Sequence, residues 1–305
     1  MNMVEPRHFA GLRGTLSFDT PLARYTSWRA GGCADLAYVP ADRDDLALFV
    51  RQLPIFETVT VLGLGSNVLV RDGGVRGAVI LLHNPGGVLA VADGLIYAEA
   101  GVACPKLARF AARHGCVGAE FLAGVPGTVG GALAMNAGCY GGETWQHVAK
   151  AELVLRDGSF AVRTAADYAI GYRSVKRAGG RPAEGIFTAA WFRFAPGDGD
   201  ASLARIRELL ARRIATQPLD LPNAGSVFRN PPNDHAARLI EGAGLKGFAI
   251  GGAKVSEKHA NFIVNPQRLA RAADIEALIE HVRSVVAAKT GVMLELEVKI
   301  IGEAA

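Results

Sequence analysis

Residues 122–138 of this chain, LAGVPGTVGGALAMNAG, contain five glycines and one proline but no charged residue. So many glycines make the segment unpromising as a helix, and the lack of charge makes it a poor surface loop. Glycine instead lets a backbone lie close against a large polar ligand and offer N–H groups in place of side chains. Only Thr128 and Asn136 carry side chains that hydrogen-bond strongly. The alternative is a buried, turn-rich packing element.

A second glycine-rich loop, Gly63-Leu64-Gly65-Ser66-Asn67, follows a β-branched stretch. It is not a P-loop, because no Gly-Lys-Ser/Thr sequence follows it, and Val68 stands where the Rossmann fingerprint has its third glycine. By itself the loop is equally compatible with a plain tight turn. Two such loops in one chain nevertheless favour an extended ligand with a phosphate middle, such as a dinucleotide.

The composition is typical of a soluble globular protein with two or three domains, since half of the 305 residues are hydrophobic and a fifth are charged. The net charge of +4 comes from scattered basic residues, so no nucleic-acid-binding arm is expected. No apolar run is long enough for a membrane helix. The histidine and cysteine spacings predict no metal site. The four cysteines form no C-x-x-C pair and indicate reduced thiols in a cytoplasmic protein.

Hydrophobic periodicity predicts mixed strands and helices. Residues 1–35 look irregular. Helices are expected at 43–52, 105–114, 202–216 and 274–289, with Ser202 as an N-cap and Gly291 as a C-cap. Strands are expected at 37–40, 58–64, 78–82, 96–100, 151–155, 160–163, 186–194 and 292–301.

The regular alternation of a doubly wound sheet is missing, so the sequence predicts an α+β fold. Glycines on either side of Asp198 indicate a linker at 198–201. We therefore expect a region of two lobes at 1–198, split near residue 84, and a smaller α+β domain at 199–305 whose last strand returns to the site.

Three further residues allow two interpretations each. Ser226 lies in AGSVFRNPP and is either a turn serine or a proton donor, because the G-x-S-x-G elbow of acyl-transfer enzymes is missing. Glu297 lies on the polar face of the last expected strand, which is either simply solvated or part of a site. Arg173 is either an exposed loop residue or a clamp for a carboxylate.

Seven segments together, in this order, resemble the UDP-N-acetylenolpyruvoylglucosamine reductase family of flavin enzymes. Any one of them could mislead, but seven in register span nearly the whole chain. They are Tyr25-Thr26 with Arg29-Ala30-Gly31-Gly32, GLGSNVLVRD (63–72), EFLAGVPGTVGGALAMNAGCYGGE (120–143), IGYRSVK (170–176), AGSVFRNP (224–231), KVSEKHANFIVN (254–265) and LELEVKIIG (294–302).

This resemblance implies a two-lobed FAD-binding region of the vanillyl-alcohol-oxidase type, followed by a C-terminal substrate domain. It implies non-covalent FAD, with NADPH as the co-substrate that reduces it. The residues implied to bind FAD are Tyr25, Gly63, Leu64, Gly65, Ser66, Asn67, Val68, Gly124, Val125, Pro126, Gly127, Thr128, Gly130, Gly131, Asn136, Ala137, Gly138 and Ile186.

The implied reaction reduces an enolpyruvyl ether of a UDP-sugar to a lactyl ether, in peptidoglycan precursor synthesis. Arg173 would stabilise negative charge that develops on the substrate carboxylate. Glu297, itself carrying a proton, would stabilise the enol-like form. Ser226 would protonate the neighbouring carbon. Substrate contacts are implied for Tyr172, Arg213, Gln217, Arg229 and Asn230, and Arg229 replaces a lysine that is common in the family.

One subclass of the family carries an extra loop with a tyrosine that closes over the substrate. Residues 181–195 leave no room for such a loop, so we expect the shorter subclass. A monomer is expected as well. Two other functions compete with this one. A different oxidase on the same scaffold would lack Ser226, Arg173 and Glu297 in their motifs, and a non-catalytic nucleotide-binding protein would not turn over NADPH.

Overall fold

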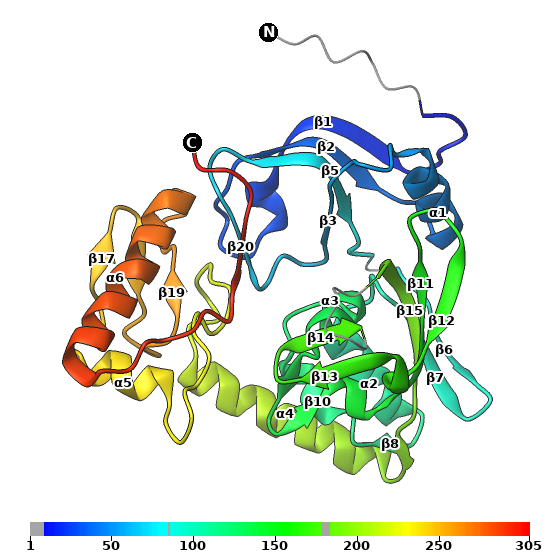
Figure 1. Ribbon diagram of the computed structural model, residues 1–305. Helices are drawn as coiled ribbons and strands as arrows, with labels where there is room; N and C mark the ends of the chain where they lie inside the picture. Colours follow the sequence, from blue (N-terminus) through cyan, green and yellow to red (C-terminus); the bar gives the residue numbers. More distant parts are fainter. Residues whose placement is uncertain (1–8, 85, 178–183) are drawn as a thin grey trace, which may run out of the picture.

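The computed structural model describes residues 9–84, 86–177 and 184–305. Its parts follow one another along the chain (Figure 1). The first sheet and its helix lie at the top, a second sheet with helices packed beside it lies below, and a C-terminal unit lies to one side. The last segment of the chain runs back from this unit to the first sheet. The mixture of antiparallel and parallel pairs agrees with the expected α+β class.

The first sheet has the strand order β1-β2-β5-β3. β1 is antiparallel to β2, whereas β5 is parallel to both β2 and β3. The helix α1 (Arg43–Gln52) lies where the sequence predicts it and is capped by the Asp42 side chain. Residues 1–35 were expected to be irregular, which is wrong for β1. The four strands are β1 (Thr15–Pro21), β2 (Cys33–Val39), β3 (Val59–Leu62) and β5 (Val75–Leu81).

The second sheet is antiparallel throughout, in the order β12-β11-β15-β7-β6. The helix α2 (Cys104–Arg113) buries Leu107 and Ala111 in the same core cluster as the strands. A hairpin of β13 (Tyr168–Gly171) and β14 (Ser174–Arg177) lies beside it. The sheet strands are β6 (Leu89–Ala92), β7 (Leu95–Glu99), β11 (Val148–Val154), β12 (Phe160–Arg163) and β15 (Ile186–Phe192).

The glycine-rich segment contains a helix, which corrects the sequence-based expectation. α3 spans Val129–Met135, with Val129, Ala132 and Leu133 buried. Its Thr128 side chain accepts a hydrogen bond from Gly131 N, and Asn136 ends it in the left-handed conformation, with φ of 46°. Tertiary burial and two end caps therefore outweigh the low helix propensity of the glycines.

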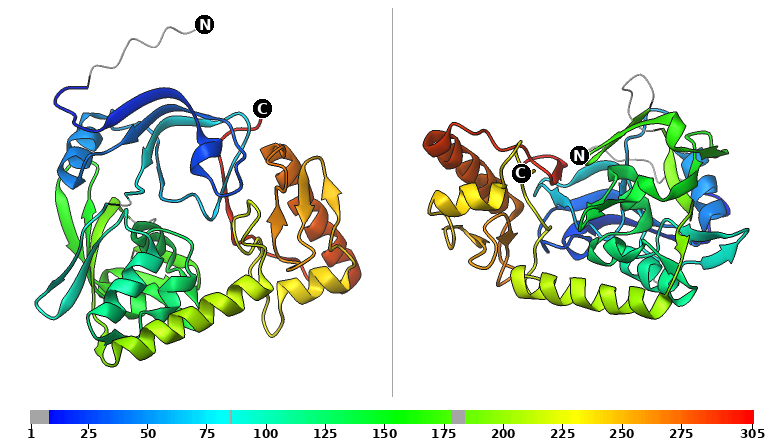
Figure 2. Two further views of the ribbon diagram at one scale, coloured as in Figure 1. Left: turned by 180° about the vertical axis from the view of Figure 1, so that it is seen from behind. Right: turned by 90° about the horizontal axis from the view of Figure 1, so that it is seen from below.

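Residues 198–201 do not form the expected linker. They begin the long helix α4 (Gly199–Thr216), because the Asp198 side chain accepts hydrogen bonds from Asp200 N and Ala201 N. The expected N-cap Ser202 lies inside this helix, is buried, and donates to Glu120 at 2.6 Å. The two further views show α4 running from the second lobe to the C-terminal unit (Figure 2). The division at 198/199 stays a prediction.

The C-terminal unit packs two helices beside a small antiparallel sheet, β17-β18-β19. The helix α6 (Ala272–Thr290) buries Ile275, Leu278, Ile279, Val282 and Val286, as its periodicity predicts. Gly291 caps it with φ of 73°. The other elements are α5 (Ala236–Gly242), β17 (Ala249–Ile250), β18 (Ala253–Val255) and β19 (Ile263–Val264).

The final segment was expected to be one strand over Val292–Ile301, which is wrong. Only β20 (Lys299–Ile301) is a strand, and it pairs in parallel with β4 (Val68–Val70) of the first lobe. Before it, Leu296 forms an isolated bridge with Phe228. The segment therefore pairs first with Phe228 and then with β4, so it does not form one continuous β-ladder. Its apolar residues still alternate along the sequence.

Candidate active site

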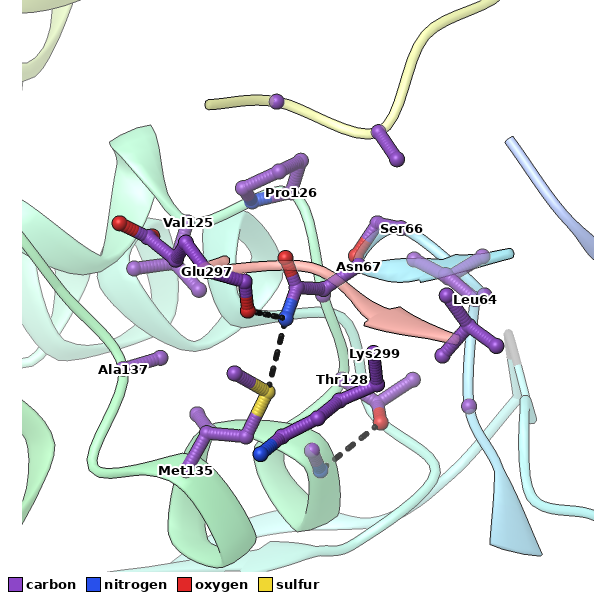
Figure 3. A pocket seen from close by; sticks show the side chains of 18 of the residues that line it. Leu64, Ser66, Asn67, Val125, Pro126, Thr128, Met135, Ala137, Glu297 and Lys299 are labelled. Atoms are coloured by element: carbon purple, nitrogen blue, oxygen red, sulfur yellow. Dashed lines mark hydrogen bonds between the residues drawn. The ribbon is translucent and has the colours of Figure 1, made fainter. Parts of the chain in front are cut away.

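The two glycine-rich loops, the Ser226 loop and the last strand line one cavity of about 390 Å³ (Figure 3). These segments are far apart in the sequence, so the cavity exists only in the folded chain. The sequence-predicted residues that line it are Gly63, Leu64, Gly65, Ser66, Asn67, Val68, Gly124, Val125, Pro126, Gly127, Thr128, Gly131, Ala137, Gly138, Arg173, Arg213, Gln217, Ser226 and Glu297.

The first loop requires glycine at position 65. Gly65 has φ of 58°, and a Cβ there would lie 2.2 Å from the carbonyl oxygen of Tyr25. Its own carbonyl oxygen accepts hydrogen bonds from the main-chain N and the hydroxyl of Ser27, both at 3.2 Å. The loop is therefore held against residues 25–27 at a distance that any side chain would prevent.

The opposite wall is bare backbone around Gly127. A Cβ built on Gly127 would have Ser66 Oγ, at 3.5 Å, as its nearest neighbour, so the protein itself leaves that space open. Hydrogen bonds hold the wall, from Cys104 N to the Gly127 carbonyl oxygen at 2.9 Å and from Val129 N to the Val102 carbonyl oxygen at 2.8 Å. A cleared and rigid wall of this kind fits a large flat cofactor such as a dinucleotide.

The third side of the cavity carries an ion pair. Arg173 Nε donates to Glu297 Oε1 at 2.8 Å, and the hydroxyl of Tyr172 donates to Oε2 at 3.2 Å. Arg173 also donates to the Gly138 carbonyl oxygen at 3.1 Å. The Glu297 residue is only 9% exposed, so the solvated interpretation is wrong for Glu297, whereas Glu295 and Lys299 on the same face are exposed. Burial, followed by the nearby Glu297 charge, raises the pKa of Tyr172.

Arg173 lies at the tip of the β13–β14 hairpin and is not an ordinary exposed loop residue. Its φ of 52° places it in the left-handed region, which costs a non-glycine residue roughly 1 kcal/mol or more. Such strain is kept where the surrounding structure fixes it, and it is common at functional sites. Here the ion pair with Glu297 and the hydrogen bond to the Gly138 carbonyl oxygen hold Arg173 in this conformation.

Ser226 lies on a segment held from both sides. Val227 N donates to the Asn261 carbonyl oxygen at 3.0 Å, and Glu297 N donates to the Val227 carbonyl oxygen at 2.8 Å. The side chain of Asn261 spans Phe228, accepting from its N at 3.0 Å and donating to its O at 2.8 Å. Within the described part of the chain the Ser226 hydroxyl has no hydrogen-bond partner. It lines the cavity and is free to serve a ligand.

Near the end of α4, Arg213 Nε donates to Gln217 Oε1 at 2.7 Å, and the Arg213 guanidinium also bonds to the Gly124 carbonyl oxygen. Both side chains line the cavity. The α4 helix thus holds a positive charge against the second glycine-rich segment.

Comparisons with known proteins identify the family. The FAD binding domain family matches residues 34–162, and the family of the UDP-N-acetylenolpyruvoylglucosamine reductase C-terminal domain matches residues 217–301. A UDP-N-acetylenolpyruvoylglucosamine reductase of Thiobacillus denitrificans is 56% identical, with 96% of this chain and 94% of that protein covered. The chain belongs to the UDP-N-acetylenolpyruvoylglucosamine reductase family. The reductase of Methylococcus capsulatus is 55% identical, with 98% of this chain and 97% of that protein covered.

A solved structure agrees with this assignment. The crystal structure of the UDP-N-acetylenolpyruvylglucosamine reductase from Thermus caldophilus superposes with a TM-score of 0.78 at 33% identity. The match covers 95% of this chain and 100% of that one. The resemblance predicted from the seven segments is therefore confirmed, as is the expected FAD-binding fold with its C-terminal domain.

Several residues that the reductase family resemblance implied lie outside the cavity. Tyr25 lines a neighbouring hollow. The Asn136 side chain is fully used by the protein, since it donates to Glu143 and to the Gly171 carbonyl oxygen and accepts from Trp145 N. Asn230 is exposed, and its side chain accepts from Ala236 N at 3.1 Å at the start of α5. Gly130, Ile186, Tyr172 and Arg229 also lie outside the cavity lining.

Arg229 and Tyr172 lie next to the cavity and not in its wall. Tyr172 reaches it through the bond to Glu297, and the charge of Arg229 acts on the Tyr172 hydroxyl. Arg229 Nη1 is 4.0 Å from Glu295, and its Nε is buried without a hydrogen-bond partner among the described residues. Buried polar atoms without a partner are rare in folded proteins.

Sequence reasoning missed the four charged, sulfur-containing or aromatic residues Lys299, Met135, Phe262 and Cys139 in the cavity wall. Lys299 follows Glu297 by two residues, and its position on the same strand face was the available signal. Asn67 donates to the sulfur of Met135 at 3.3 Å, and Figure 3 shows this contact beside Glu297. Phe262 and Cys139 complete the set, and nothing in their sequence spacing pointed to the cavity.

The described residues form neither a metal site nor a membrane-spanning helix. No group of three or more His, Cys, Asp or Glu side chains there is arranged to hold a metal ion. Among the helices built from those residues, none has both the length and the apolar character needed to cross a membrane.

Proposed function

We propose that this chain reduces UDP-N-acetylenolpyruvoylglucosamine to UDP-N-acetylmuramate with FAD and NADPH, a step of peptidoglycan precursor synthesis. Membership of the reductase family supports this activity. The observation that carries the residue assignment is that Ser226, Arg173 and Glu297, from three separate segments, line one glycine-walled cavity.

FAD would be held non-covalently by the backbone of residues 63–68 and 124–131, with the other family-implied positions around them. The open wall at Gly127 and the close approach at Gly65 support this placement. When bound, FAD accepts a hydride from NADPH and delivers one to the vinyl CH₂ carbon of the sugar ether. The protein supplies position and electrostatic field.

Arg173 and Glu297 would act on the substrate carboxylate. Negative charge grows on that carboxylate during reduction, and a preorganised guanidinium stabilises it. Glu297 Oε1 accepts a hydrogen bond from Arg173 Nε at 2.8 Å. We propose that Glu297 carries a proton when the substrate is bound. It would then donate a hydrogen bond to the enol-like carboxylate of the substrate, and Arg173 would bind that carboxylate instead of Glu297.

Ser226 would donate the proton that completes the lactyl ether. A serine hydroxyl is a weak acid, so its effect depends on position. The hydrogen bonds of Val227 to Asn261 and Glu297 fix that position. Tyr172, Arg213, Gln217, Arg229 and Asn230 remain proposed substrate contacts. Arg213 and Gln217 are the best supported because they line the cavity, and Tyr172 is bonded to Glu297, which also lines it.

We further propose a cytoplasmic monomer of the shorter subclass, with its domain division at 198/199. The strand β15 occupies Ile186–Phe192 within the 181–195 interval, which supports the absence of the extra tyrosine loop from these residues. Residues 181–183 of that interval lie outside the described residues.

An anaerobic titration tests this function. We expect the purified protein to show a flavin spectrum, which NADPH bleaches and the UDP-enolpyruvyl sugar restores in the absence of oxygen. Oxygen consumption with a sugar substrate would favour a different oxidase. Flavin or UDP binding without bleaching would favour a non-catalytic protein. Failure of the sugar to restore the bleached spectrum would contradict the proposal.

Filling the open wall tests the cofactor site. We expect Gly127→Val to lose bound FAD but to keep the thermal stability of the FAD-free wild-type protein, because the new side chain meets no protein atom closer than 3.5 Å at its Cβ and occupies the cavity. The measurement is the ratio of flavin absorbance to protein absorbance beside the melting temperature. Gly242→Val, with nothing within 4 Å at its Cβ and outside the cavity, is the control and should keep its flavin.

A further inference from the structure

A second hollow, of about 670 Å³, opens directly beside the flavin cavity. The two share Gly63, Leu64, Ser66, Pro126, Arg213 and Gly225, so a ligand can extend from one into the other. The hollow is also lined by His83, Arg268 and residues 24–27, 29 and 219–223. The proposed chemistry at Ser226 and Glu297 does not use these segments.

The hollow has a strong excess of positive charge. Arg24, Arg29, Arg213 and Arg268 line it, against the single carboxylate of Asp220. In the described ranges, neither Arg24, Arg29 nor Arg268 has a carboxylate partner. Arg29 donates to the main-chain oxygen of Arg24 at 2.6 Å, and within the described residues its guanidinium makes no other hydrogen bond. Unpaired guanidinium groups gathered in a hollow favour a phosphate.

A buried junction holds these arginines in place. Asn265, fully buried, donates through its side chain to the Trp28 carbonyl oxygen at 3.0 Å and through its main chain to the Pro222 carbonyl oxygen at 2.9 Å. The indole N–H of Trp28, also fully buried, donates to Ile263 O at 2.7 Å. Three loops are therefore joined at one point. Arg29 follows Trp28 directly, and Arg268 lies three residues after Asn265.

The backbone at both arginines is strained. Arg29 and Arg268 each have φ of 59°, in the left-handed region that non-glycine residues seldom adopt. Each costs roughly 1 kcal/mol or more, which a chain keeps when the resulting side-chain direction is useful. Two such residues facing one cationic hollow indicate a binding site and not a random surface.

We propose that this hollow binds the 2′-phosphate of NADPH, a subsite that rests on the proposed function. NADPH and the UDP-sugar must each bring a reacting group to the same flavin, and each carries a diphosphate. Only NADPH carries an additional phosphate monoester, with a charge near −2 at neutral pH. An arginine-rich hollow that continues the cavity gives this group a place that the sugar nucleotide leaves empty, and it makes the chain prefer NADPH over NADH.

Direct binding tests the subsite without turnover. Oxidised holoprotein is titrated calorimetrically with adenosine 2′,5′-bisphosphate and with ADP. For Arg268→Ala and Arg29→Ala we expect roughly tenfold weaker binding of the 2′,5′-bisphosphate, the loss that one charge-assisted hydrogen bond gives, and unchanged binding of ADP. Arg207→Ala removes an exposed arginine of α4 outside both hollows and should change neither. Equal weakening of both ligands, or of neither, would overturn the proposal.

Half-reactions give the second readout. In both variants the NADPH concentration needed for half-maximal flavin reduction should rise roughly tenfold. The NADH concentration needed for half-maximal reduction and the UDP-sugar concentration needed for half-maximal reoxidation should stay at their wild-type values. A matching loss for the sugar would assign the hollow to the substrate diphosphate, and a lower flavin content would assign it to FAD; either result overturns the proposal. If neither nucleotide reduces the wild-type flavin, the proposed function itself has failed. Arg268→Gln repeats the test if Arg268→Ala does not fold.

Discussion

Ser226→Ala is expected to leave reduction of the flavin by NADPH intact and to slow its reoxidation by the UDP-sugar by roughly 10²–10⁴-fold, the range of a lost general acid. The reason is geometric. The hydroxyl lines the cavity without a hydrogen-bond partner among the described residues, so its removal disturbs no protein contact. Stopped-flow absorbance measures the two half-reactions separately.

The matched control is Ser284→Ala, the same chemical change at an exposed position of α6. It should leave both half-reactions unchanged. If Ser226→Ala slowed both half-reactions equally, Ser226 would be a structural residue of the loop and the proton would come from another group.

Arg173→Ala is expected to slow the same sugar half-reaction by roughly 10²–10³-fold, the effect of removing one preorganised donor from developing negative charge. The change also leaves Glu297 without the guanidinium 2.8 Å away, so weaker sugar binding should accompany the slower step. The apparent sugar affinity and the limiting rate, measured from the concentration dependence of reoxidation, separate the two effects.

Arg173→Lys is the informative companion. Both variants keep the strained backbone at φ of 52°, so the cost of that conformation is the same in each. Lysine keeps the charge but cannot bond Glu297 and the Gly138 carbonyl oxygen with a planar fork as arginine does. Partial recovery of the rate is expected. Equal activity of Arg173→Ala and the wild type would remove Arg173 from the mechanism.

The sequence predicted regular elements well where one face of an element is buried in a single environment. The helix at 43–52 and the buried face of α6 are in their expected places. Prediction failed where tertiary contacts compete with local preference. Val129–Met135 is helical despite its glycines, because Thr128 and Asn136 cap it and its apolar side is buried. The segment 292–301 alternates like one strand, yet it pairs first with Phe228 and then with β4.

The site could be predicted only in part from the residues. Glycine spacing identified two loops but not their contact with each other, which depends on the pairing of distant strands. Glu297 looked the same as Glu295 from its spacing, and only the position of Arg173 at a hairpin tip distinguishes them. The arginine-rich hollow gave no local signal, because Arg24, Arg29 and Arg268 come together through the buried Asn265 junction.

The pairing of β20 with β4 has a consequence for how the polypeptide matures. Asn67 donates to the Glu297 carbonyl oxygen, a contact between residues 230 positions apart. During translation, the loop at Gly63–Asn67 emerges long before the segment that completes it. Contacts between such distant residues form slowly. We therefore expect the coenzyme to bind only after β20 has been synthesised. Until then the unfinished chain should need protection.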